Sequence, residues 1–169
     1  GRRLTELDTE IVSVALPEWQ ANLYEAARVT AEKSIADIVA RYGFSAGRNR
    51  ILARLMIMRQ MCLDPQISSI PAIGDNPEYP AKTQKLLELL AQFAHEGKRV
   101  VVTSFFTSWI DRLVPVVQAA GHRAVCIKGK TSRSGRGEAV QKFRAGEATI
   151  LFTQTRLAQG WETPEADVI

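Results

Sequence analysis

The second half of the chain alternates short apolar runs with longer amphipathic segments, and this alternation restricts the fold more than any other feature. Three runs have the length of buried strands, and three segments repeat apolar residues at helical spacing. The expected strands are residues 100–102, 124–127 and 149–152, and the expected helices are residues 82–95, 106–120 and 136–144. Continuous apolar strands separated by helices are typical of a parallel sheet covered on both faces. We therefore expect an α/β fold here.

The first part of the chain has helical periodicity instead. A helix is expected to open at Pro17, because proline suits the first helical position. Two glycines between residues 42 and 47 interrupt it, and a second helix ends before Pro65, since the residue preceding proline disfavours helical geometry. Four prolines and no periodicity then predict a linker. The expected division is a helical segment at 1–65, a linker at 66–81 and the α/β domain at 82–169.

Composition excludes several classes of protein. The chain has 169 residues, of which 46% are hydrophobic, enough for a packed core. No apolar run approaches the ~20 residues of a membrane span, and no leader with a cleavage site is visible. We expect an intracellular protein, cytoplasmic or nuclear, with no membrane partner. Cys62 and Cys126 are expected to be buried free thiols, and His95 and His122 lack ligand spacing, so no metal site is predicted.

Basic residues are concentrated between Gly121 and Arg144. Seven lysines and arginines face a single acid there, Glu138, so this segment carries +6 while the whole chain carries +4. A local basic patch is typical of a surface that binds a phosphate backbone. On charge alone, a solvated face that keeps the protein soluble explains the segment equally well.

Polar residues follow all three expected strands. The carboxyl ends of parallel strands meet at one edge, where open α/β sheets bind ligands. Hydroxyls, helix-start amides and lysines hold phosphate oxygens, although a single Ser or Thr there is more often a plain N-cap. Three clusters on one edge predict contact with a nucleic-acid backbone by Ser104 and Thr107, then by Lys128, Gly129, Lys130, Thr131, Ser132 and Arg133, and finally by Thr153 and Gln154 in the loop after residue 152.

No catalytic residues are predicted. The chain has no G-x-x-x-x-G-K-S/T phosphate loop, no Asp-Glu pair after a strand to hold magnesium, and no nucleophile beside a base. Asp111 and Arg112 lie in an expected helix and are most simply a solvated pair. The residues by themselves predict a basic α/β module that contacts phosphate and is not an independent enzyme.

Several segments, in order and at matching spacing, resemble the Swi/Snf-type DNA translocases of helicase superfamily two. The resemblance rests on the family's L-x-x-L-R-Q-x-C-x-H-P signature, its motif IV, its D-G-S-T-S loop and its motif V, which match residues 52–65, 101–108, 127–132 and 153–162. Asp64 replaces the signature's histidine and Lys128 the loop's aspartate. Leu157-Ala158-Gln159 stands where two glycines are expected, and Glu162 stands where motif V has asparagine.

The resemblance implies a RecA-like fold and the second lobe of an ATP-dependent motor, truncated after motif V, that grips double-stranded DNA and closes a nucleotide cleft. It implies that Gly160 and Glu162 lie against the nucleotide. It also implies that the intact motor uses ATP and Mg²⁺, and that its partners are double-stranded DNA and a first RecA-like lobe. We expect this chain alone to hold neither cofactor and to hydrolyse no ATP, because a phosphate loop and an arginine finger are missing.

The alternative is a non-catalytic module on the same fold that binds nucleic acid or a protein. The sequence is compatible with a motor that moves along DNA and with one that unwinds its strands, and it predicts no oligomeric state.

Overall fold

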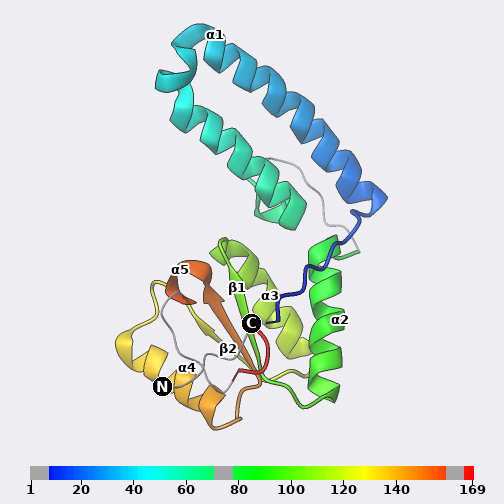
Figure 1. The fold of residues 1–169 in the computed structure, drawn as a ribbon, viewed down its shortest axis with the longest axis vertical. Helices are drawn as coiled ribbons and strands as arrows, with labels where there is room; N and C mark the ends of the chain where they lie inside the picture. Colours follow the sequence, from blue (N-terminus) through cyan, green and yellow to red (C-terminus); the bar gives the residue numbers. More distant parts are fainter. Residues whose placement is uncertain (1–7, 71–77, 159–165) are drawn as a thin grey trace.

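The computed structural model describes residues 8–70, 78–158 and 166–169. Figure 1 shows a long helical hairpin standing on an α/β part. In chain order the elements are α1 (Glu18–Leu63), η1 (Pro65–Ile67), α2 (Ala81–His95), β1 (Val100–Ser104), α3 (Thr107–Ala119), β2 (Ala124–Ile127), α4 (Arg133–Arg144), β3 (Ile150–Gln154) and α5 (Thr155–Ala158). Within these described ranges, no helix has the length and apolar character to cross a membrane.

The hairpin consists of two helical arms within α1. They join at Gly43, whose φ of 73° and ψ of 165° are not helical and suit glycine alone. Beyond this break the second arm folds back beside the first (Figure 1). Gly47 lies where the arms meet, and a Cβ atom there would come within 2.6 Å of Ile38 Cγ2. The glycines between residues 42 and 47 therefore make both the turn and the close approach of the arms.

The three strands form a parallel sheet in the order β1-β3-β2. One face packs on α2 and α3 through Leu90, Ile110 and Phe152, and the other packs on α4 through Leu151 and Phe143. These side chains are almost completely buried. The predicted parallel sheet with helices on both faces, preceded by a helical segment, is confirmed.

Several predictions about the α/β part need correction. The first strand runs to Ser104 and not to residue 102, and α4 begins at Arg133 and not at residue 136. The third strand ends at Gln154 and not at Phe152, so Thr153 and Gln154 belong to β3 and not to a loop. The reason is that β3 is the central strand, and Thr153 pairs with Thr103 on one side and Ile127 on the other. The two cysteines are free, as predicted, but each is only partly buried.

Candidate nucleic-acid interface

The three strand ends meet at one edge of the sheet, as their parallel order requires. Ser104 at the end of β1 lies opposite Gln154 at the end of β3. The Gln154 side chain crosses to the loop after β2, where its Oε1 accepts a hydrogen bond of 3.0 Å from the Gly129 amide. The structure therefore joins two of the predicted clusters directly and places the third beside them.

Hydrogen bonds hold the loop after β2 in a defined shape. Thr131 Oγ1 accepts from the Lys128 amide at 2.9 Å, and the Thr131 amide donates to the Lys128 carbonyl at 2.9 Å. Arg136 of α4 donates from Nε to the Thr131 carbonyl and from Nη2 to the Gly129 carbonyl, both at 3.0 Å. Arg136 therefore positions the loop, and its guanidinium is not a free cation of the basic segment.

Two predicted hydroxyl groups serve the backbone. Ser132 is the N-cap of α4, and its Oγ accepts from the Gly135 amide at 3.2 Å. Ser104 is buried, and its Oγ accepts from the Phe106 amide at 3.1 Å, which shapes the turn into α3. An N-cap hydroxyl satisfies an amide that the helix itself leaves unpaired. Both residues thus orient the edge, while Thr107 opens α3 in a partly buried position.

The basic segment carries fewer free charges than its sequence indicates. Lys128 forms an ion pair with Asp111 of α3, and this hydrogen-bonded carboxylate raises the pKa of Lys128. Lys142 pairs with Glu138 at 2.7 Å. Lys130 and Arg133 are exposed and pair with no residue in the part of the chain that the structure describes. They are the charges of the edge that a phosphate could reach.

The predicted pairing of Asp111 with Arg112 is wrong, because adjacent residues of a helix do not face each other. Asp111 turns to Lys128. Arg112 turns to the end of α1, where its Nε donates to Asp64 Oδ2 at 3.0 Å. The Asp64 carboxylate is almost completely buried, and its Oδ1 accepts from the Gln66 amide at 2.9 Å. This ion pair ties the hairpin to the sheet's helices.

Besides the buried Ser104, three predicted site residues are not on the described edge surface. The Thr153 side chain is fully buried on the central strand, and its Oγ1 has no hydrogen-bond partner among the residues described. It therefore lies inside the protein and not on the predicted nucleic-acid surface. Gly160 and Glu162 fall outside the residues that the structure describes.

One pair of residues at the edge was not predicted. Phe105, directly after β1, is 51% exposed, and the Arg59 guanidinium of α1 lies 5.4 Å from the centre of its ring. Both line an open cleft of about 610 Å³ between the second arm of α1 and the strand ends. The two residues are far apart in sequence, so only the exposed position of an aromatic residue after a strand could have indicated the pair.

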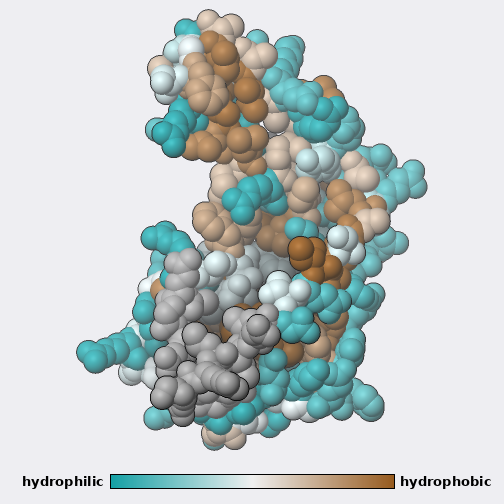
Figure 2. Space-filling view, in the orientation of Figure 1, coloured by the Kyte–Doolittle hydropathy of each residue, from teal (hydrophilic) through white to brown (hydrophobic). Residues whose placement is uncertain are grey.

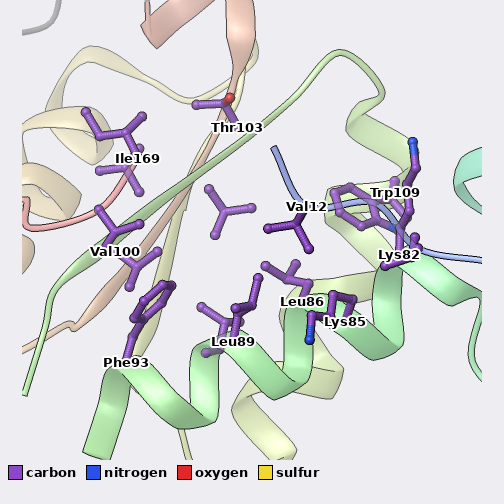
Figure 3. A pocket seen from close by; sticks show the side chains of 15 residues that line it. Val12, Lys82, Lys85, Leu86, Leu89, Phe93, Val100, Thr103, Trp109 and Ile169 are labelled. Atoms are coloured by element: carbon purple, nitrogen blue, oxygen red, sulfur yellow. The ribbon is translucent and has the colours of Figure 1, made fainter. Parts of the chain in front are cut away.

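A second cavity, of about 500 Å³, lies beside β1, along the edge of this strand that does not pair with β3. Figure 3 shows Val12, Leu86 and Phe93 pointing into it. The Val101 amide donates to the Val168 carbonyl at 2.9 Å along this strand. The lining is mainly apolar, and no group of His, Cys, Asp or Glu among the described residues could hold a metal ion.

Comparison with known proteins identifies the family. Residues 81–169 match the helicase conserved C-terminal domain, and this is more than half of the chain. The chain therefore belongs to the helicase conserved C-terminal domain family. It is similar to an ATP-dependent RNA helicase of Yarrowia lipolytica, with 26% identity over 89 residues, which are 53% of this chain and 17% of that protein. The chain thus spans about a sixth of that relative's length.

The fold is that of SWI2/SNF2 ATPase lobes. The C-terminal domain of the Sulfolobus solfataricus SWI2/SNF2 ATPase superposes with a TM-score of 0.76 at 16% identity, over 93% of this chain and 68% of that one. The core of the same ATPase in complex with double-stranded DNA gives a TM-score of 0.74 at 16% identity, over 92% of this chain and 32% of that one. The predicted helicase C-terminal lobe with a RecA-like fold is confirmed.

Proposed function

We propose that this chain is the second motor lobe of an ATP-dependent translocase of the Swi/Snf type, which tracks double-stranded DNA. Support comes from the extent of the fold match. The match to the RNA helicase covers 89 residues, too few to include both α1 and the whole α/β part. The superposition on the SWI2/SNF2 C-terminal domain covers 93% of the chain and so takes in the hairpin as well.

The contact with the DNA backbone is proposed at the carboxyl edge of the sheet. The observation that carries this proposal is the loop at residues 128–132, held in shape from both sides by Gln154 and Arg136. It presents Lys130 and Arg133 to solvent at the start of α4. Helix N-termini favour anions, and a pre-shaped loop loses little entropy when a phosphate binds. Thr131 and Ser132 shape this surface, with Ser104 and Thr107 beside it.

The nucleotide is proposed to lie on a different part of the chain. Because residues 153–162 resemble motif V, we propose that Gly160 and Glu162 face an ATP molecule with Mg²⁺. A first RecA-like lobe would hold this ATP through its phosphate loop. The partners are therefore double-stranded DNA and that lobe. The second candidate, a module that binds without hydrolysis, is favoured by Leu157-Ala158-Gln159, which replaces the glycines that let the backbone approach closely.

The test is salt-dependent binding of a labelled DNA duplex, measured by fluorescence anisotropy. The double substitution Lys130→Glu with Arg133→Glu removes two proposed phosphate contacts, so the slope of log affinity against log salt should fall by about 1.8. Lys33→Glu with Lys98→Glu makes the same change of charge away from the edge, because Lys33 lies on α1 and Lys98 precedes β1. The control should keep the original slope. Equal slopes for the edge variant and the unaltered chain would refute the assignment of this edge.

A further inference from the structure

We propose that the tip of the helical hairpin, residues 41–50, is a second nucleic-acid-binding surface, separate from the carboxyl edge of the sheet. The tip is the turn between the two arms of α1, and it lies at the end of the hairpin that points away from the sheet (Figure 1). The proposed function uses only the α/β part and the loop after β2, so this inference adds a surface to it and stands on different residues.

The charge of the second arm supports the proposal. No acidic residue occurs between Asp37 and Asp64, whereas five arginines do, namely Arg41, Arg48, Arg50, Arg54 and Arg59. This stretch carries +5 and the segment from Gly121 to Arg144 carries +6, so the rest of the chain carries −7. A solvated face normally mixes both signs. Two separate stretches whose charged residues are almost all basic, on an otherwise acidic chain, are complementary to a polyanion.

Exposed aromatic rings accompany these arginines. Phe44 is 69% exposed and Tyr42 is 43% exposed, so both rings are open to solvent. The Arg50 guanidinium lies 4.0 Å from the centre of the Tyr42 ring. Hydrogen bonds from Arg41 and then Arg50 lower the pKa of the Tyr42 hydroxyl. Arginines interleaved with free aromatic rings bind phosphates and stack on bases, and the Phe44 ring is available for such stacking.

The backbone presents this cluster in one defined shape. Gly43 makes the reversal between the arms with a φ of 73°, and Gly47 brings the second arm against Ile38 of the first. Phe44 and Arg48 are therefore held on a built turn and not on a loose loop. Figure 2 shows apolar residues gathered at this end of the molecule beside hydrophilic ones. A surface that mixes apolar and basic groups on a fixed turn is typical of a binding site.

The occupant we favour is nucleic acid, and the spacing of the two surfaces supports this choice. The second arm runs from Phe44 to Leu63, and twenty helical residues span about 30 Å. Duplex DNA rises 3.4 Å per base pair, so about nine base pairs cover the same length. One strand or duplex of moderate length can therefore reach from the sheet edge to the tip. An acidic protein segment is the competing occupant, and the test separates the two.

The experiment measures binding of a labelled duplex and a labelled single strand of equal sequence to the 169-residue chain. Arg48→Glu with Arg50→Glu should weaken the binding of both nucleic acids. For the duplex, the affinity lost between 50 and 200 mM salt should shrink about 12-fold, which is the share of two contacts with a slope of about 0.9 each; for the single strand, with about 0.7 each, it should shrink about 7-fold. Phe44→Ala should weaken the single strand about tenfold, because stacking on an unpaired base is lost. Val29→Ala, another exposed apolar residue of α1, is the matched control and should change neither affinity.

Three outcomes would count against the proposal. Unchanged binding of both nucleic acids by the double arginine variant would overturn it, and unchanged single-strand binding by Phe44→Ala would overturn the stacking role. If poly-glutamate binds as tightly as nucleic acid and loses affinity with the same arginine substitutions, the tip binds acidic protein instead. Circular dichroism confirms that each variant is folded. The Lys130→Glu, Arg133→Glu variant distinguishes the two surfaces, since failure at the sheet edge leaves the tip result unaffected.

Discussion

The ion pair between Asp64 and Arg112 allows a quantitative test of how the hairpin is fixed to the α/β part. The Asp64 side chain is 5% exposed, and its carboxylate has two donors, the Arg112 Nε and the Gln66 backbone amide. In the Arg112→Ala variant the Asp64 carboxylate stays buried. Among the residues that the structure describes, the Gln66 backbone amide is then its one remaining donor. Breaking a fully buried pair in this way costs about 3–5 kcal/mol. The Arg112 side chain is 49% exposed, so water can enter the vacated position, and we expect a loss of about 2 kcal/mol.

Asp64→Asn should cost less, about 1 kcal/mol, because an amide oxygen still accepts from the Gln66 amide and no buried charge remains. When both substitutions are combined, no carboxylate is left without a cation. The double variant should therefore be more stable than the sum of the single losses predicts, by about 1 kcal/mol. The matched control is Arg123→Ala, an exposed arginine outside this pair, with an expected change within about 0.5 kcal/mol.

The assay is urea denaturation followed by circular dichroism, with the m-value compared between variants. If the two losses add to within about 0.3 kcal/mol, Asp64 and Arg112 do not interact and the reasoning is refuted. A loss for Arg112→Ala no larger than that for Arg123→Ala would refute it in the same way.

Three other predictions concern the hairpin and the sheet. Gln20 is fully buried, donates to the Met61 carbonyl at 3.0 Å and accepts from the Ala81 amide at 2.9 Å. Gln20→Ala should therefore cost about 2–4 kcal/mol in urea denaturation, and a loss under about 0.5 kcal/mol would contradict it. Gly43→Ala should cost about 1–3 kcal/mol in thermal unfolding, because its φ of 73° is strained for alanine; an unchanged midpoint would disprove the turn. Burial raises the pKa of the Cys126 thiol, so less of it is thiolate at a given pH. In a variant without the other cysteine, alkylation followed by mass spectrometry should reach half its maximal rate above the ordinary thiol pKa, and a midpoint at or below that value would contradict the burial.

Periodicity was enough to predict the sheet, because strands buried on both faces are apolar throughout and the helices between them have one apolar side. It failed at the end of β3, where Thr153 is polar and yet fully buried on the central strand. Burial there depends on the two neighbouring strands, which a local pattern does not contain. The same limit explains Gln20, whose partners at Met61 and Ala81 are distant in sequence.

The meeting of the three polar clusters at one edge was predicted, whereas the interactions of their side chains were not. The sequence pattern placed three polar clusters at one edge because parallel strands end together. It counted Lys128 and Arg136 as free charges, whereas Lys128 pairs with Asp111 and Arg136 holds the loop. Whether a lysine is free depends on the carboxylates that the fold brings near it, and Asp111 comes from another helix.

The central claim is that this lobe belongs to a motor on double-stranded DNA, although its sequence relatives include an ATP-dependent RNA helicase. Competition tests the claim most directly. A labelled DNA duplex is bound to the chain and displaced with an unlabelled DNA duplex or with single-stranded RNA of equal length, at one fixed salt concentration. We predict that the DNA duplex displaces the probe at lower concentration, and that Lys130→Glu with Arg133→Glu weakens this binding. Displacement by RNA at lower concentration than by duplex DNA would contradict the proposed translocase.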